Sequence, residues 1–135
     1  MKSLLPIVIV LALAGAFGVW HKRSRGVLKL KNMPGTITQE MIGGALGTRA
    51  TLVQFSSAFC TPCRATRALL ENVVRDLNDV VHIDIDAEDH LELVRQLNIL
   101  STPTTLILNS KGIEVGRAVG APKREQVLNA LAAIR

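Results

Sequence analysis

Tyrosine is absent from this chain of 135 residues, which contains one tryptophan, three phenylalanines and two cysteines. So few aromatic side chains argue against the stacking platforms on which proteins bind single-stranded nucleic acid. Two cysteines are also too few for the disulfide scaffold of a small secreted domain. They occupy positions 60 and 63, so a bond between them closes too short a loop to add much stability by chain entropy. If these cysteines have a role, it is a chemical one.

Acidic residues are absent from the first 31 positions, which hold six of the 16 Lys and Arg residues. The other ten basic residues accompany all eleven Asp and Glu residues in 32–135, which gives that part a net charge of −1. The overall charge of +5 therefore belongs to the N-terminal end. The remainder has no basic surface for a phosphate backbone, and no nucleic-acid partner is expected.

Residues 4–20 contain no charged side chain. As a helix they would span roughly 26 Å, slightly less than the ~30 Å core of a bilayer. Trp20 stands where an interfacial aromatic would lie, and basic residues follow at once. We favour a single transmembrane helix in contact with lipid. The chain then divides into residues 1–25, the anchor with its basic flank, and residues 26–135, one folded domain.

Two other interpretations of residues 4–20 stay open. Small residues at 12 and 14, and again at 14 and 16, would suit cleavage of a signal peptide, and a buried helix is the third possibility. For a single-pass protein of the cell membrane, the positive-inside rule keeps the more basic C-terminal flank in the cytoplasm, together with the domain. An extracytoplasmic domain is the alternative.

The rest of the chain alternates between strand and helix patterns. This order predicts an α/β fold in which helices flank a central mixed sheet. We expect strands over residues 26–31, 51–56, 80–86, 104–109 and 113–119, and helices over residues 38–46, 62–78, 89–97 and 122–134.

The strongest chemical motif is Cys60-Thr61-Pro62-Cys63, at the point where a strand leads into a helix. A helix N-terminus carries unpaired N–H groups and partial positive charge, which favour a thiolate. Pro62 suits the first helical turn, and Arg64 adds positive charge nearby. Cys60 is expected to attack a disulfide, and Cys63 to resolve the mixed disulfide one turn later.

Two other interpretations of the cysteine pair stay open. The cysteines could be ordinary small residues that happen to be close. A zinc site would need two more ligands, and the only histidines of the domain, His82 and His90, lack paired-ligand spacing. No metal is expected.

Four segments, in order, resemble the thioredoxin family: TLVQFSSAFCTPCR, VVHIDIDAED, NILSTPTTLILNSKG and VGRAVGAPKREQVLNAL. The resemblance covers residues 27–135 and implies a thioredoxin-like fold. It implies a cis bond between Thr102 and Pro103, and a substrate surface formed by Phe59, Thr102, Pro103 and Gly120. It also implies protein thiol or disulfide substrates, a redox partner such as a thioredoxin reductase or a membrane thiol carrier, and no cofactor beyond the redox-active cysteine pair.

The chain departs from the family pattern at several positions of the site. Phe59 replaces the usual Trp, and Thr61 replaces the usual Gly between the cysteines. Gln54 occupies the place of the family's buried Asp and cannot titrate. His82 aligns with the family's buried Lys and is a candidate for proton handling. The acidic residues at 84, 86, 88 and 89 are interpreted as a solvated strand end.

Three functions follow from this pattern. The main one is a thiol–disulfide oxidoreductase that reduces protein disulfides. The second keeps the site but runs it as an extracytoplasmic oxidase or isomerase. The third is a tethered module whose cysteine pair senses redox state without turnover. The reduction potential separates the first two, since reductases lie near roughly −270 mV and strong oxidants near roughly −120 mV.

Overall fold

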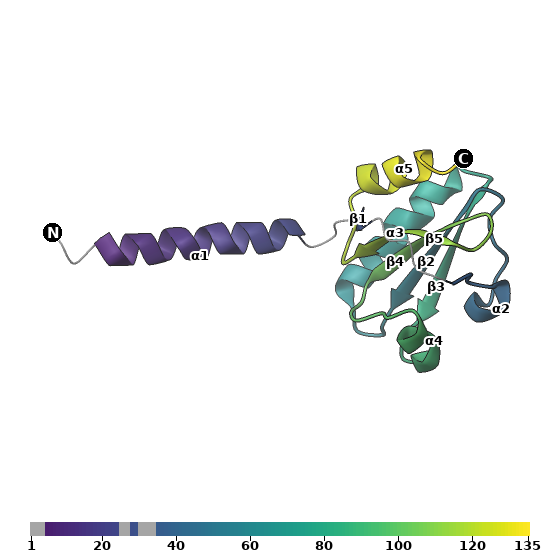
Figure 1. Cartoon of the computed structure of the whole chain (residues 1–135), viewed down its shortest axis with the longest axis horizontal. Coiled ribbons are helices and arrows are strands. Elements are labelled where there is room, and N and C mark those ends of the chain that lie inside the picture. The colour runs from purple at the N-terminus through teal and green to yellow at the C-terminus, as the bar shows by residue number, and fades with distance from the viewer. Residues whose placement is uncertain (1–4, 25–27, 30–34) are drawn as a thin grey trace.

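The computed structural model describes residues 5–24, 28–29 and 35–135. A five-stranded sheet, in the order β1-β5-β4-β2-β3, forms its centre (Figure 1). The β2–β3 pair is parallel and the others are antiparallel, so the expected mixed sheet is confirmed. The strands are β1 (Leu28–Lys29), β2 (Ala50–Ser56), β3 (Val80–Asp86), β4 (Thr104–Asn109) and β5 (Glu114–Val119), and the helices are α1 (Leu5–Ser24), α2 (Gln39–Ile42), α3 (Thr61–Arg75), α4 (Leu91–Gln96) and α5 (Arg124–Ala132).

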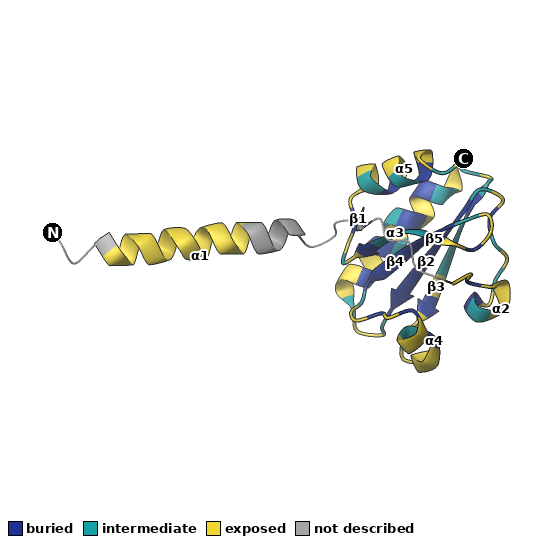
Figure 2. Ribbon diagram, in the orientation of Figure 1, coloured by how far each residue is buried: buried dark blue, intermediate teal, exposed yellow. Residues whose placement is uncertain are grey.

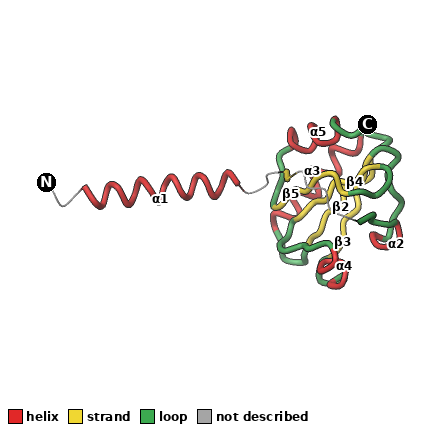
Figure 3. The backbone as a smooth tube through the Cα atoms, viewed as in Figure 1, coloured by secondary structure: helices red, strands yellow, loops and turns green. Residues whose placement is uncertain are grey.

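Helices pack on both faces of the sheet because β2 is apolar on both sides. Leu52 packs with side chains of α3 and α5 in one buried cluster. Val53 and Phe55 point the other way and pack with Ile42 of α2 and Leu93 of α4. Figure 3 shows the strands between these helices, and Figure 2 shows the buried central strands. All seven residues of β2 are buried, as expected for a central strand of a doubly covered sheet.

Helix α3 lies directly after β2 and carries the cysteine motif. Its buried positions are Cys63, Thr66, Leu70 and Val73, a spacing that places one face of the helix against the sheet. The helix ends at Arg75, three residues before the predicted end. Asp76 takes the C-cap position with non-helical backbone angles. Packing along most of the helix therefore holds its N-terminal end, which carries the cysteine motif, against the sheet.

The helix expected over residues 38–46 is much shorter than predicted. Thr38 caps it, and its hydroxyl accepts a hydrogen bond from the Met41 backbone N–H. The helix stops at Ile42 because Gly43 adopts a left-handed conformation with φ of 67°. A glycine in this conformation ends a helix without steric cost.

A tight turn joins β4 and β5, the antiparallel strands expected over residues 104–109 and 113–119. Gly112 has a φ of 76°, and a Cβ atom there would lie 2.2 Å from the Ile37 carbonyl oxygen. The side-chain oxygen of Asn109 accepts hydrogen bonds from the backbone N–H groups of Lys111 and Ile113. The tight turn thus depends on glycine at 112 and on an Asx-type interaction.

The segment expected to form the membrane anchor folds as helix α1, and its residues 6–19 are exposed (Figure 2). In the described part of the chain, no helix has both the length and the apolar character needed to cross a bilayer. The predicted transmembrane helix is therefore not supported. Of the strand expected over 26–31, β1 supplies Leu28–Lys29. The rest of that range, and the expected domain boundary at 25–26, lie outside the described residues.

Candidate redox site at the start of helix α3

Cys60 and Cys63 form a disulfide at the N-terminus of α3, with an S–S distance of 2.05 Å. Cys60 is the N-cap residue, and its Sγ accepts a hydrogen bond of 3.2 Å from the Cys63 backbone N–H. That geometry would also stabilise a thiolate at Cys60 after reduction. Pro62 lies in the first turn of the helix. A backbone N–H at that position would have no acceptor within the helix, so proline costs no hydrogen bond there.

The two sulfur-bearing residues differ in exposure. Cys63 is only 1% exposed, whereas Cys60 is partly exposed. A substrate can therefore reach Cys60 more readily than Cys63, which suits the roles predicted for them. Arg64 follows on the exposed side of the helix.

A cleft of about 280 Å³ opens beside the disulfide. Both cysteines line it, together with polar and charged side chains from β2, β3 and α3. These are Ser56, Ser57, Arg64, Arg67, Asp84 and Asp86, with Ala58 completing the wall.

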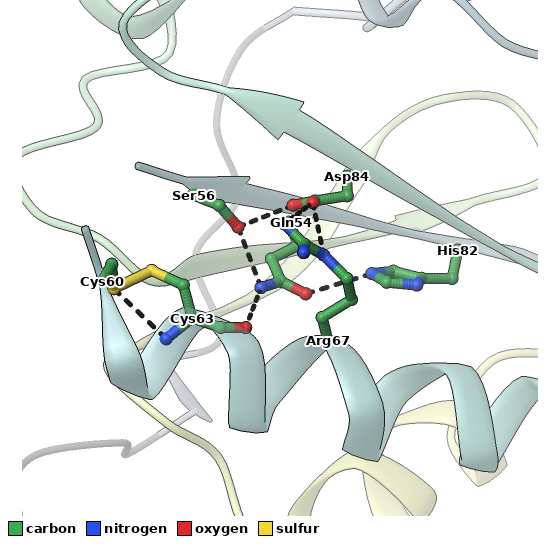
Figure 4. Close-up of polar contacts among 7 residues, drawn as sticks. All are labelled: Gln54, Ser56, Cys60, Cys63, Arg67, His82 and Asp84. Atoms are coloured by element: carbon green, nitrogen blue, oxygen red, sulfur yellow. Dashed lines mark hydrogen bonds and ion pairs between the residues drawn. A yellow bond between two sulfur atoms is a disulfide. The ribbon is translucent and has the colours of Figure 1, made fainter. Parts of the chain in front are cut away.

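Gln54 is fully buried and lies beside Cys63, between the cysteine pair and His82 (Figure 4). Its Nε2 donates to the Cys63 carbonyl oxygen at 2.9 Å and to Ser56 Oγ at 3.0 Å. The Ser56 hydroxyl in turn donates to Asp84 Oδ1 at 2.6 Å. Arg67 of α3 forms an ion pair with the other carboxylate oxygen of Asp84. A continuous hydrogen-bonded network thus connects the turn that holds Cys63 with β2 and β3.

His82 lies at the far end of this network from the disulfide. Its Nε2 lies 3.1 Å from Gln54 Oε1, and because that oxygen can only accept, we assign the ring proton to Nε2. Burial lowers the pKa of His82; Asp84 and Glu71 act in the opposite direction, and Arg67 adds to the lowering. The ring is therefore neutral near pH 7. His82 is connected to Cys63 only through the side-chain amide of Gln54, which cannot titrate.

The other predicted site residues lie around the loop that precedes β4. The bond between Thr102 and Pro103 is cis, as the resemblance implied. Thr102 Oγ1 lies 3.1 Å from Ser57 Oγ, which ties this loop to the segment before the cysteines. The backbone N–H of Gly120 donates to the Pro103 carbonyl oxygen at 2.8 Å. These contacts bring Thr102, Pro103 and Gly120 together beside the cysteine loop.

Phe59 is 97% exposed, directly before Cys60. Leu100, in the loop before Pro103, is 87% exposed. Nearly all of the apolar surface of these two side chains is therefore in contact with solvent. Nothing in the residue pattern had singled out Leu100.

Sequence reasoning also missed Ser56, Arg67 and the contacts of Asp84. The interpretation as a solvated strand end holds for Asp86, Glu88 and Asp89, which are exposed. It is incomplete for Asp84, whose side chain is 24% exposed but bonds to both Ser56 and Arg67. In the described residues, no three His, Cys, Asp or Glu side chains lie close enough together to hold a metal ion.

Known proteins resemble this chain in sequence and in fold. The rice (Oryza sativa subsp. japonica) protein Thioredoxin H2-1 is 31% identical over 78 residues, which are 58% of this chain and 56% of the rice protein. Thioredoxin from Mycoplasma genitalium is 26% identical over 78 residues, which are 58% of this chain and 76% of that protein. The chain thus spans little more than half the length of the rice relative.

Solved structures of thioredoxins also resemble this chain. Thioredoxin NaTrxh from Nicotiana alata superposes with a TM-score of 0.59 and 25% identity, over 65% of this chain and 75% of that one. Fasciola hepatica thioredoxin has the same fold, with a TM-score of 0.58 and 21% identity over 66% of this chain and 84% of that one. The family model described as Thioredoxin matches residues 39–133, which include the disulfide, the buried network and the cis-proline loop. The chain therefore belongs to the thioredoxin family.

Proposed function

We propose that this protein reduces disulfide bonds in other proteins by dithiol–disulfide exchange at Cys60 and Cys63. One observation carries the proposal: a reachable Cys60 sulfur at a helix N-terminus is bonded to a buried Cys63 sulfur one turn later. Disulfide exchange needs this asymmetry, because one thiol must meet the substrate and the other must stay close to resolve the intermediate.

The cycle starts from the reduced pair. The Cys60 thiolate attacks one sulfur of a substrate disulfide, which breaks the substrate S–S bond and releases the first substrate thiolate. The Cys63 thiolate then attacks Cys60 Sγ, which forms the Cys60–Cys63 bond and releases the second substrate thiolate. The substrate gains two electrons and, after protonation, two protons. A dithiol redox partner, such as a thioredoxin reductase or a membrane thiol carrier, restores the reduced pair.

We place the substrate chain over Phe59, Thr102, Pro103 and Gly120. The exposed ring of Phe59 would cover an apolar substrate side chain next to the attacked sulfur. The cis-proline loop would present the backbone of Thr102 to the substrate backbone, as in the family that this chain resembles.

The full chain with dithiothreitol as electron donor provides the test. It should precipitate insulin by reducing the insulin disulfides, and the double variant Cys60→Ser, Cys63→Ser should not. The same chain titrated against glutathione should have a reduction potential near roughly −250 mV or below. A potential well above roughly −200 mV would replace the reductase with an oxidase or isomerase.

The redox-sensor alternative makes a different prediction for the variant Cys63→Ser. A reductase with this substitution should accumulate mixed disulfides with many proteins, because resolution is blocked. One dominant partner, together with absent insulin reduction by the unsubstituted chain, would favour a sensor.

We also propose that α1 holds the domain at a lipid bilayer, on the cytoplasmic side. The support is the apolar surface of this helix, where Val8, Val10, Leu11 and Leu13 are each more than 60% exposed, together with the basic residues that follow in the sequence. Contact with lipid would remove this surface from water.

Flotation with vesicles tests the lipid contact. The full chain should float with vesicles of phosphatidylcholine and phosphatidylglycerol, and molar salt should not release it. The variant Val10→Asp, Leu11→Asp should stay at the bottom of the gradient. Equal flotation of the two chains, or release by salt alone, would contradict an apolar anchor.

A further inference from the structure

We propose that Asp84 accepts the proton of the Cys63 thiol when Cys63 resolves the mixed disulfide. This inference rests on the proposed function and adds a residue to it. The resolving step needs a thiolate at Cys63, a residue that is only 1% exposed. Its proton must pass to a group that can hold it and then release it to water.

Gln54 lies closest to Cys63 in the buried network, but an amide cannot take the proton. Both of its donated bonds are committed, to the Cys63 carbonyl oxygen and to Ser56 Oγ. Its oxygen faces Nε2 of His82. The amide therefore separates the imidazole from the cysteines, and His82 is not among the residues that line the cleft. These positions argue against the imidazole as the acceptor.

Asp84 meets the requirements that Gln54 and His82 do not. Its carboxylate lines the same cleft as Cys60 and Cys63. A cleft of about 280 Å³ has room for water, whose share of liquid volume is about 30 Å³ per molecule. Asp84 can thus receive a proton from Cys63 through the cleft. Because 24% of its side chain is exposed, it can pass the proton on to bulk water.

Two contacts fix the direction of the Asp84 carboxylate. Arg67 binds Oδ2 from α3, and the Ser56 hydroxyl donates to Oδ1 from β2. In-register parallel pairing sets Gln54 of β2 opposite Asp84 of β3, and both side chains point toward α3. The carboxylate is therefore held at the wall of the cleft rather than free in solvent (Figure 4).

The charges around Asp84 are mixed. Arg67 and Arg64 approach from α3, with Glu71 farther along the same helix, while Asp86 and His82 lie on β3 itself. β2 contributes only the neutral Ser56 and Gln54. Arg67 offsets the charge of the carboxylate, so a negative group can stand close to a thiolate that forms nearby.

The step balances as follows. The Cys63 S–H bond breaks and its proton moves to Asp84. The thiolate attacks Cys60 Sγ, the Cys60–Cys63 bond forms, and the bond from Cys60 to the substrate sulfur breaks. The substrate sulfur leaves with the electron pair, and the proton on Asp84 passes to water or to that sulfur.

The test follows the second step directly, in the reduced full chain mixed with excess Ellman's reagent in a stopped-flow spectrometer. The first release of coloured thiolate reports attack by Cys60, and the second reports attack by Cys63. Asp84→Asn should slow the second release at neutral pH by at least about a hundredfold, the low end for loss of a proton-transfer group. Its rate should climb with pH and approach that of the unsubstituted chain in alkaline solution. Asp84→Glu should recover most of the rate.

Two matched variants separate proton transfer from structure. Asp89→Asn removes an exposed carboxylate after β3, outside the cleft, and should leave the second release within about twofold of the unsubstituted rate. Arg67→Gln breaks the ion pair but keeps the Asp84 carboxylate, so it should slow the step far less than Asp84→Asn. An unchanged rate and pH profile in Asp84→Asn would overturn the inference, as would an equal loss in Arg67→Gln.

Failure of the proposed function gives a different result. The unsubstituted chain would then leave insulin intact, whatever the rate of the second release from Ellman's reagent. The rate of the second release and its pH profile thus test the role of Asp84. The reduction of insulin tests the proposed reductase activity.

Discussion

The imidazole Nε2 of His82 and the amide Oε1 of Gln54 lie 3.1 Å apart, on the side of Gln54 that faces away from the disulfide (Figure 4). Thioredoxins resembling this chain place an Asp and a Lys at these two positions. Here the pair is neutral, because an amide cannot ionise and because burial lowers the pKa of His82. In this chain the two side chains form a neutral hydrogen-bonded pair, and the charged groups of the network, Asp84 and Arg67, lie at its edge.

The lowered pKa of His82 makes stability depend on pH. The ordinary histidine pKa is about 6.5, so the unfolded chain binds a proton at this position before the folded chain does. The contribution of neutral His82 is therefore present above about pH 6.5 and declines as the pH falls below that value. Urea unfolding between about pH 8 and about pH 5 should show this decline, and His82→Gln should reduce it. An unchanged decline in His82→Gln would show that another group causes it.

A carboxylate at position 54 should place an ionisable group beside Cys63. Gln54→Glu keeps the size of the side chain but loses the Nε2 donor to the Cys63 carbonyl and to Ser56. We expect a loss of about 1–3 kcal/mol in the free energy of unfolding at neutral pH. The pKa of His82 should rise, because a nearby negative charge favours the imidazolium. Urea unfolding and an NMR titration of the imidazole measure the two effects, and an unchanged titration would show that the side chains no longer touch.

The exposed ring of Phe59 should matter for protein substrates and not for stability. It is 97% exposed, so Phe59→Ala should change the free energy of unfolding by less than about 0.5 kcal/mol. Insulin reduction should fall several-fold through a higher KM, while a small disulfide such as Ellman's reagent should react at the original rate. Leu128→Ala, at an exposed leucine of α5, controls for loss of surface area. An equal effect of Phe59→Ala on both substrates would show that the ring acts on Cys60 and not on docking.

The sequence predicted those parts of the molecule that depend on neighbours along the chain. The strand expected over residues 51–56 is present as β2, and the cysteine motif lies at the start of the next helix, as predicted. The resemblance added the cis bond before Pro103, which no local pattern would have required. The predicted length of the helix after Thr38 was wrong, because the end of this helix depends on the backbone conformation of Gly43.

The contacts of Asp84 needed the three-dimensional structure. An acidic residue near a strand end can face solvent or a hydroxyl group of the neighbouring strand. The outcome for Asp84 depends on the register between β2 and β3, which are 24 or more residues apart in the chain. Here residue 56 pairs with residue 86, and Ser56 therefore lies one step diagonally from Asp84 on the same face of the sheet. Because side chains along β3 alternate between the two faces of the sheet, Asp84 and His82 lie on the same face. The sequence does not show which element covers that face. Arg67 of α3 covers it, and nothing in the sequence near Asp84 indicates so.

Removing one partner of the ion pair between Arg117 and Glu114 should cost far more stability than removing one partner of the pair between Arg67 and Asp84. The Glu114 side chain is 2% exposed and that of Arg117 is 11% exposed, whereas the Arg67 pair is 42% and 24% exposed. Arg117→Leu would leave a buried carboxylate without its partner, at a cost of about 3 kcal/mol. Arg67→Gln should cost less than about 1 kcal/mol.

Arg117 also holds the segment that leads to the cis-proline loop. Its guanidinium donates to the carbonyl oxygens of Leu97, at 2.8 Å, and Asn98, at 3.2 Å. Arg117→Leu should therefore lower the rate of insulin reduction as well as the midpoint of urea unfolding. The double variant Glu114→Gln, Arg117→Leu should recover part of the stability, because the uncompensated charge is gone. It should recover none of the lost activity, because the two carbonyl contacts are still missing. Recovery of both would show that the buried charge alone accounts for the effect.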